Sequence, residues 1–178
     1  MTNHSSRRSL VSTFALLVAA TAATALPQPI HAQAPASTAA AAPVTAKNGD
    51  VDVNGARIHY QLYGDPSTGK TPLLVLHGAL MSSDAMKSLI DPLAATRPVI
   101  AIDARGHGRS GRVDGKLSYD LMADDAAAVL AKLGVKHADV LGYSMGGSTA
   151  IALAVRHPGQ VGKQVILSGT SRLDGWYP

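Results

Sequence analysis

Several residue types are missing from this chain of 178 residues, and each absence narrows what the protein can be. The chain has no cysteine, which excludes disulfides and thiolate metal sites. It also has no glutamate, since all 12 acidic residues are aspartate. The formal charge of +4 falls to +2 without Arg7 and Arg8, which lie in a segment that we expect to be removed. So small an excess provides no electrostatic footprint for nucleic acid, and we expect no such partner.

Residues 1–34 have the pattern of an export signal peptide. Arg7 and Arg8 supply the positive start, residues 10–26 are apolar and rich in alanine, and Ala32-Gln33-Ala34 is a small-x-small cleavage pattern. Cleavage after Ala32 also fits, and the alternative is a membrane anchor that stays in place. The two arginines additionally resemble a twin-arginine signal. We therefore expect an exported protein, periplasmic or secreted, with no stable membrane span after cleavage.

Residues 35–49 are mostly Ala, Pro, Thr and Ser, which cannot bury a core, so we expect a flexible linker there. The globular domain is expected over residues 50–178. In its first hairpin, apolar and polar residues alternate over residues 57–63, which predicts one buried face and places His59 on the solvent side.

Strand and helix patterns then alternate along the rest of the chain. Alternating buried strands and helices predict an α/β fold with a mostly parallel, doubly wound sheet. Ligands bind such sheets beyond the carboxyl ends of the strands. The expected strands are residues 51–53, 57–63, 73–76, 99–102, 138–141 and 165–167, and the expected helices are residues 82–93, 118–133 and 148–156.

The most informative stretch is Gly142-Tyr143-Ser144-Met145-Gly146, a G-x-S-x-G pattern. It follows a buried strand and precedes a helical pattern, which is the context of a nucleophile elbow. The two glycines fit a turn too tight for larger side chains. The following helix would direct its positive end at Ser144, where negative charge develops during acyl transfer.

With two further motifs, the chain resembles the N-terminal part of an α/β-hydrolase. These motifs are His77-Gly78 after the strand at 73–76, and a loop from Asp103 to Ser110 after the strand at 99–102. All three motifs occur in the family's order. The resemblance covers residues 51 to about 170 and implies a sheet that stops after the sixth strand, without the cap and the C-terminal strands. Esterases, enol-lactonases, carbon–carbon bond hydrolases and cofactor-free perhydrolases share this style of motif.

The resemblance assigns roles to individual residues. Ser144 matches the nucleophile, and the backbone N–H groups of Met145 and Ala79 match the oxyanion hole, with Leu80 as the second donor if the turn is offset. His77 matches a turn-fixing residue. Three further residues are structural by the same comparison, namely Gly78, Gly142 and Gly146. The resemblance also gives Asp103, Arg105 and His107 a bracing role, and we favour loop architecture for them. It implies no metal and no cofactor.

The family's catalytic acid and histidine follow the serine in the chain, and here only 34 residues follow Ser144. Asp174 could match the acid, or it is a loop residue. His157 lies a whole helix away, roughly 18–20 Å at 1.5 Å per residue, and cannot be the base. We therefore expect an exported serine hydrolase of small-molecule esters or related acyl compounds that is inactive as this chain. The alternatives are a non-catalytic remnant or binding protein, a perhydrolase, or a carbon–carbon bond hydrolase.

Overall fold

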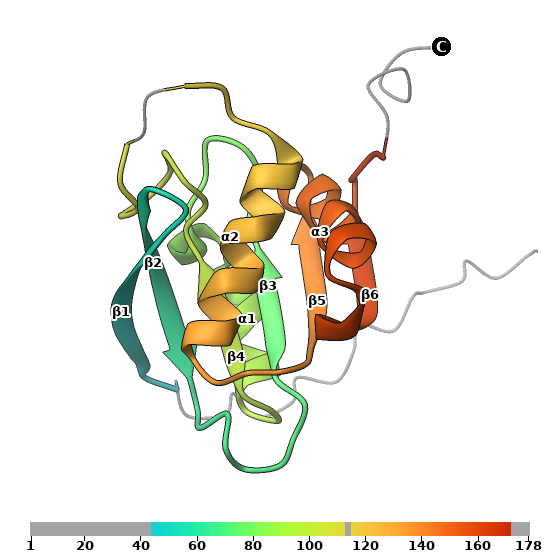
Figure 1. Ribbon diagram of the computed structural model, residues 1–178. Helices are drawn as coiled ribbons and strands as arrows, with labels where there is room; N and C mark the ends of the chain where they lie inside the picture. The colour runs from blue at the N-terminus through green and yellow to red at the C-terminus, as the bar shows by residue number, and fades with distance from the viewer. Residues whose placement is uncertain (1–43, 113–114, 172–178) are drawn as a thin grey trace, which may run out of the picture. The chain divides into compact units, whose positions relative to one another are not determined.

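The computed structural model describes residues 44–112 and 115–171, and Figure 1 shows their arrangement. Six strands form one sheet in the order β1-β2-β4-β3-β5-β6. The strands are β1 Ala46–Val53, β2 Ala56–Tyr63, β3 Leu73–Leu76, β4 Val99–Ile102, β5 Ala138–Tyr143 and β6 Val161–Leu167. The helices are η1 Ser83–Met86, α1 Lys87–Ala94, α2 Tyr119–Lys132, α3 Met145–Arg156 and η2 Pro158–Gln160.

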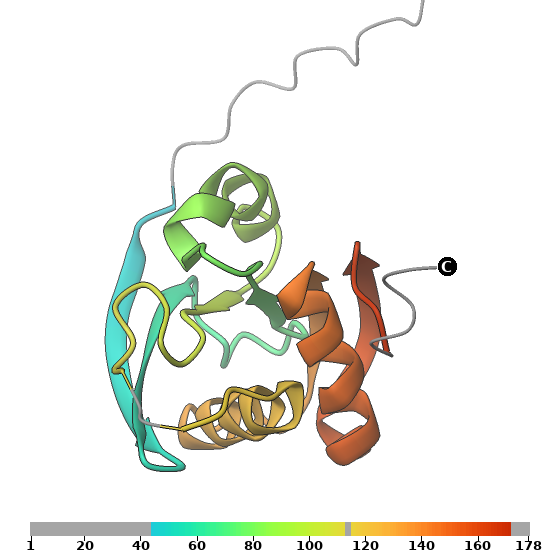
Figure 2. The same ribbon diagram turned by 90° about the horizontal axis from the view of Figure 1, so that it is seen from above.

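The sheet is parallel at its centre and antiparallel at one edge. β3 pairs in parallel with β4 and β5, and β5 pairs in parallel with β6, whereas β1 and β2 form an antiparallel hairpin against β4. Figure 2 shows α1 on one side of the sheet and α2 and α3 on the other. This arrangement confirms the mostly parallel, doubly wound α/β sheet expected from the sequence.

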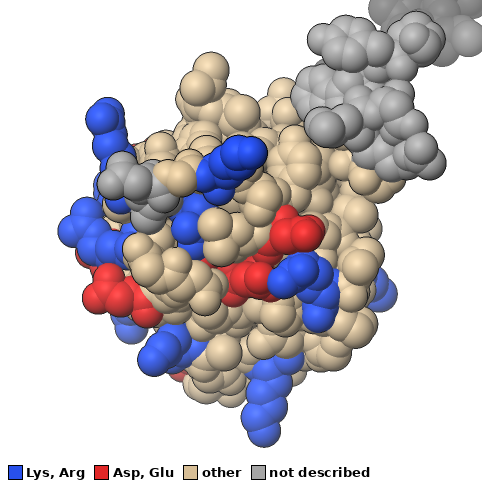
Figure 3. Space-filling model, turned by 45° about the horizontal axis from the view of Figure 1, so that its top comes forward, with Lys and Arg blue, Asp and Glu red and all other residues tan. Residues whose placement is uncertain are grey.

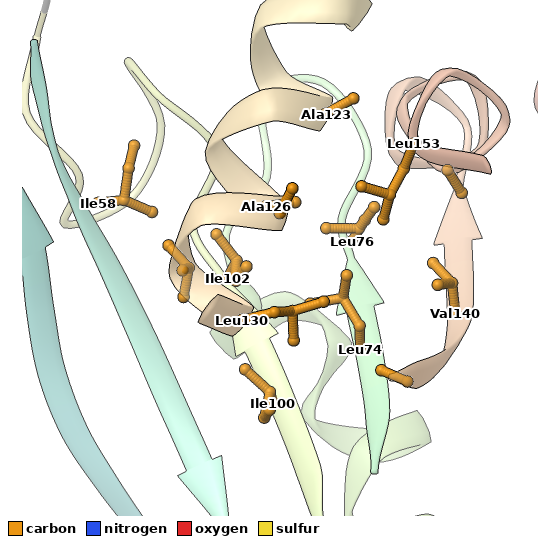
Figure 4. Packing of buried hydrophobic residues seen from close by; sticks show 14 of the residues in the cluster. Ile58, Leu74, Leu76, Ile100, Ile102, Ala123, Ala126, Leu130, Val140 and Leu153 are labelled. Atoms are coloured by element: carbon orange, nitrogen blue, oxygen red, sulfur yellow. The ribbon is translucent and has the colours of Figure 1, made fainter. Parts of the chain in front are cut away.

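Two hydrophobic clusters, one on each face, explain why the central strands are apolar throughout. Leu74, Ile100 and Val140 point into the cluster under α2 and α3, which Figure 4 shows from close by. Their neighbours Val75 and Ala101 belong to the cluster under α1. Because successive side chains of a strand point to opposite faces, a strand covered on both sides has no polar position.

The first strand begins earlier than the sequence suggests. β1 starts at Ala46, so the expected linker, residues 35–49, extends into the described sheet, and the expected boundary at residue 50 lies inside β1. Ala46 and Gly49 pair with Tyr63 and Tyr60 of β2. A hairpin strand satisfies its backbone through its partner, and so these residues need little apolar character. Residues 1–34, with the expected signal peptide, lie outside the described part of the chain.

The prediction that β2 has one buried face is wrong. His59, Gln61 and Tyr63, expected toward solvent, are all buried, and His59 is only 6% exposed. The His59 ring contacts the Asp50 carboxylate (Nδ1–Oδ1, 2.9 Å), and Tyr63 packs in the cluster under α1. Elements distant in sequence cover this face, which is why alternation alone did not reveal its burial.

The last strand is an edge of the sheet among the described residues. Its residues Val165 and Leu167 are 50% and 41% exposed. They lie beside Leu141 and Tyr143 of β5, and Leu141 belongs to the cluster under α1. This part of the α1 face is therefore apolar and uncovered by the described residues. Within the same residues, none of the helices combines the length and the apolar character needed to cross a membrane.

Candidate active site

Ser144 occupies the sharp turn between β5 and α3. Its backbone has φ 52° and ψ −115°, a strained combination for a residue with a side chain. The Ser144 N–H donates to the carbonyl of Leu167 in β6 (2.7 Å), and its carbonyl accepts from the Gly147 N–H (2.9 Å). The turn is thus held by the neighbouring strand on one side and by the first turn of α3 on the other.

The two glycines of the elbow are required by close backbone approach. A Cβ atom at Gly146 would lie 2.7 Å from the carbonyl oxygen of His77 and still closer to Leu76. A Cβ atom at Gly142 would lie 2.7 Å from the Cα of Gly147. Only glycine lets α3 approach the ends of β3 and β5 this closely, which places the helix N-terminus beside Ser144.

The residues expected to form the oxyanion hole share one pocket with Ser144. A cavity of about 470 Å³ is lined by Ala79, Leu117, Ser118, Tyr119, Met122, Ser144 and Met145. Met145 is the first residue of α3, where backbone N–H groups have no partner in a preceding turn. Leu80, the offset alternative to Ala79, does not line the cavity; it is 98% exposed and has φ 59°.

The walls of this pocket carry no formal charge. Leu117, Tyr119 and Met122 come from the beginning of α2 and the residue pair before it, and sequence reasoning did not assign them to the site. The available signal was that α2 begins at the same sheet edge as Ser144. Figure 3, which brings the upper side of Figure 1 forward, shows Lys and Arg interleaved with Asp over this side of the molecule.

His77 is buried beneath the pocket, with 2% of its surface exposed. Its Nδ1 lies 2.7 Å from the Gly78 carbonyl oxygen, and its Nε2 accepts the Ala104 N–H at 2.9 Å. Burial lowers the pKa of His77, although the Gly78 carbonyl and the charge of Asp103 oppose this effect. Both ring nitrogens are therefore engaged, and His77 is not free to act as a base for Ser144.

The loop that follows β4 is held to its neighbours by buried hydrogen bonds and an ion pair. The Asp103 carboxylate accepts the backbone N–H groups of Ser83 (2.6 Å) and Arg109 (2.8 Å). Arg105 makes a two-bond ion pair with Asp125 of α2, and both side chains are buried. These contacts agree with loop architecture rather than with a direct chemical role.

The remaining histidine candidates for a base contact groups other than Ser144. His157, at the end of α3, contacts the Asp124 carboxylate of α2 (Nε2–Oδ1, 2.7 Å). The His107 ring lies near that of His77, with 5.4 Å between centroids, and its Nδ1 contacts the Arg105 carbonyl. No histidine of the described residues lines the Ser144 pocket. Asp174, the proposed acid, lies outside the described residues.

A family model described as "alpha/beta hydrolase fold" matches residues 71–176. The "Putative carbamate hydrolase RutD" of Caulobacter segnis is 37% identical over 119 residues, which are 66% of this chain and 45% of that protein. The 2-hydroxymuconate semialdehyde hydrolase of Pseudomonas sp. (strain CF600) is 40% identical over 104 residues, 56% of this chain and 36% of that protein. The chain thus spans less than half the length of these relatives.

Solved structures give the same match in three dimensions. The structure titled "Est816 as an N-Acyl homoserine lactone degrading enzyme" has a TM-score of 0.64 and 36% identity, over 68% of this chain and 45% of that one. The structure "Epoxide hydrolase CorEH without ligand" has a TM-score of 0.67 and 30% identity, over 72% and 44% of the two chains. The two matches therefore cover about two thirds of this chain or more, but less than half of each solved chain.

Proposed function

This chain belongs to the α/β-hydrolase fold family, and we propose that it supplies the nucleophile and oxyanion hole of an exported serine hydrolase. The proposed substrates are carboxylic esters or related acyl compounds. The observation that carries the proposal is that Ser144, Ala79 and Met145 line one pocket, with Ser144 strained at the N-terminus of α3. The uncharged pocket walls favour a substrate whose group next to the carbonyl is apolar.

The proposed reaction assigns one step to each of these groups. The Ser144 Oγ attacks the substrate carbonyl carbon, and the backbone N–H groups of Ala79 and Met145 stabilise the resulting oxyanion. The intermediate then expels the alcohol, which takes a proton, and leaves an acyl group on Ser144. Water releases the acid and restores the hydroxyl. The proton of Ser144 needs a base, which the proposal places in a part of the protein outside residues 44–171.

Labelling and mutation of Ser144 test the proposal in the complete gene product, meaning this chain with any residues that its gene encodes after Pro178. A fluorophosphonate is expected to label Ser144 and no other serine, as read by peptide mass spectrometry. Ser144→Ala should lower ester turnover by about 10⁴–10⁶-fold. Ser148→Ala, four residues later in α3, is the matched control. Label on Ser110 or Ser148 instead would contradict the assignment of the elbow.

Export is a separate part of the proposal. It is supported by Arg7 and Arg8, by the apolar run that follows and by the cleavage pattern Ala32-Gln33-Ala34. The mature protein is expected to begin at Gln33 or Pro35, and intact-mass measurement of the protein outside the cytoplasm tests this. A folded product that keeps Met1 would contradict it.

A second candidate activity is hydrolysis of a carbon–carbon bond, which the similarity to the 2-hydroxymuconate semialdehyde hydrolase favours. The two candidates differ in what the pocket must bind. A panel that pairs simple esters with carbon–carbon bond substrates distinguishes them by relative kcat/KM.

A further inference from the structure

A small internal cavity lies next to the Ser144 pocket. Its volume of about 20 Å³ is room for a single water molecule and is too small for a substrate group. Its walls come from the ends of the central strands and from the first turns of α2 and α3. Figure 4 labels four of the apolar residues that line it, namely Ile58, Leu76, Ile102 and Ala126.

Two methionines separate this cavity from the Ser144 pocket. Among the described residues, Met122 and Met145 are the two that line both spaces. Both are buried, with 6% and 9% of their surface exposed. Methionine is unbranched and adapts its shape to its surroundings at little cost. The wall between the two spaces therefore consists of residues with flexible side chains.

Of the two, Met122 is the one whose side chain is independent of the proposed chemistry. Met145 supplies a proposed oxyanion N–H, and its carbonyl accepts a hydrogen bond from the Thr149 hydroxyl (2.9 Å). Met122 lies in the first turn of α2, where its N–H donates to the Ser118 carbonyl (3.1 Å). Changing the Met122 side chain therefore leaves the groups that act on the substrate carbonyl in place.

We propose that Met122 is a specificity-determining residue that limits the length of the substrate's acyl chain. Attack bonds the acyl carbon to the Ser144 Oγ, so the chain next to this carbon extends into the pocket that Ser144 and Met122 line. The chain ends against the Met122 side chain, and the cavity behind Met122 is closed to it. The substrates are then esters whose acyl chain is short enough to end there. This inference rests on the proposed function of Ser144.

Met122→Ala tests the limit in the complete gene product. The change removes Cγ, Sδ and Cε, and it joins the pocket to the cavity. Across nitrophenyl esters from acetyl to decanoyl, the longest chain that is hydrolysed efficiently should lengthen by about three carbons, one for each atom removed. Because each buried methylene is worth about fourfold, kcat/KM just beyond the parent's limit should rise by about tenfold or more.

Met86→Ala is the matched control. Met86 is 6% exposed, like Met122, but it belongs to the cluster under α1 on the opposite face of the sheet. It loses the same atoms from an equally buried position, so a general effect of weaker packing would appear in both variants. The chain-length limit should stay where it is in Met86→Ala. An unchanged limit in Met122→Ala, or the same shift in both variants, would overturn the proposal.

A double variant identifies the space that the longer chain uses. Ala126 lies one turn after Met122 and lines the cavity but not the Ser144 pocket. Ala126→Val should leave the limit of the parent unchanged, yet it should reverse part of the gain in Met122→Ala. Where Met122→Ala does not fold, Met122→Val removes fewer atoms and should lengthen the limit by about one or two carbons.

Two further measurements separate the possible failures. A second ester series with a fixed acyl group and alcohols of increasing length should show no shift in Met122→Ala. A shift confined to this series would overturn the assignment of Met122 to the acyl chain. If Ser144→Ala keeps full turnover, the proposed function fails. If Ser144→Ala abolishes turnover while Met122→Ala leaves the acyl limit unchanged, only the role of Met122 fails.

Discussion

Single side chains at this site are constrained mainly by backbone groups. His77 binds the Gly78 carbonyl and the Ala104 N–H, and Asp103 binds two backbone N–H groups. Gly142 and Gly146 are required because neighbouring backbone lies where a Cβ would be. The geometry around Ser144 therefore depends on exact residue types even where no side chain lines the Ser144 pocket.

Gly146→Ala tests this at one residue. The new methyl group would lie against Leu76 and the His77 carbonyl, so we expect the free energy of unfolding to fall by about 1–3 kcal/mol or more. The matched control is Gly159→Ala in η2, where nothing lies within 4 Å of the new Cβ. Chemical denaturation of both variants measures the difference, and equal stability would show that α3 can move back without cost.

His77 also predicts a pH dependence of stability. Burial lowers the pKa of His77 in the folded state below the ordinary histidine value of about 6.5, so the unfolded chain binds this proton first as pH falls. The contribution of neutral His77 is therefore complete above about pH 6.5 and is lost as pH falls below that value. Denaturation at about pH 7.5 and 5.5 should show a larger loss in the parent than in His77→Gln. Equal losses would mean that His77 keeps its ordinary pKa.

At the scale of elements, the two sheet faces are joined to the helices in different ways. Apolar side chains pack the helices against the centre of the sheet on both faces. On one face, a buried ion pair between Arg105 and Asp125 also ties α2 to the loop after β4. Asp125 in addition accepts a hydrogen bond from Asn54 (3.0 Å) in the β1–β2 turn. One carboxylate thus connects a helix, a loop and a hairpin.

Asp125→Asn should be strongly destabilising because it leaves the Arg105 charge buried without its partner. We expect a loss of about 3–5 kcal/mol in the free energy of unfolding. The control is Asp91→Asn, which removes the exposed ion pair with Lys87 and should cost less than about 1 kcal/mol. Urea unfolding compares the two, and a similar small cost for both would show that water reaches Arg105.

The sequence predicted the elements whose signals are local. The central strands follow from runs such as Leu73–Leu76, and the elbow follows from glycines that flank Ser144 after a buried strand. The burial of His59 and the pocket wall at Leu117 depend on loops that are distant in sequence, and no local pattern reports them. The exposure of Val165 agrees with the expectation of a sheet that stops after the sixth strand, which leaves the apolar run at residues 165–167 at an edge.

On the scale of the whole molecule, one sheet edge and part of one face are apolar and exposed among the described residues. Within the described ranges β6 pairs only with β5, and Val165 and Leu167 lie on the face that α1 covers elsewhere. An exposed apolar edge is a template for pairing with another chain. The Caulobacter segnis relative is more than twice as long as the region that it shares with this chain.

Residues 33–178 alone are therefore expected to associate and to show little or no hydrolysis of an activated ester. The chemical reason is that no histidine of the described residues lines the Ser144 pocket. Size-exclusion chromatography should give a large or heterogeneous species. Val165→Lys at the sheet edge should reduce association more than the control Val155→Lys, which changes an exposed side chain of α3. A monomer with a sharp melt and ester turnover that Ser144→Ala abolishes would refute this expectation.

The hydrogen bond from the Ser144 N–H to the Leu167 carbonyl has a consequence for the order of events during synthesis. The strained turn at Ser144 is completed by a residue that the ribosome adds 23 positions later. Until Leu167 has left the ribosome and β6 has docked on β5, this support for the serine is absent. A nascent chain that ends before β6 therefore carries the G-x-S-x-G sequence without the backbone anchor that holds Ser144 in place.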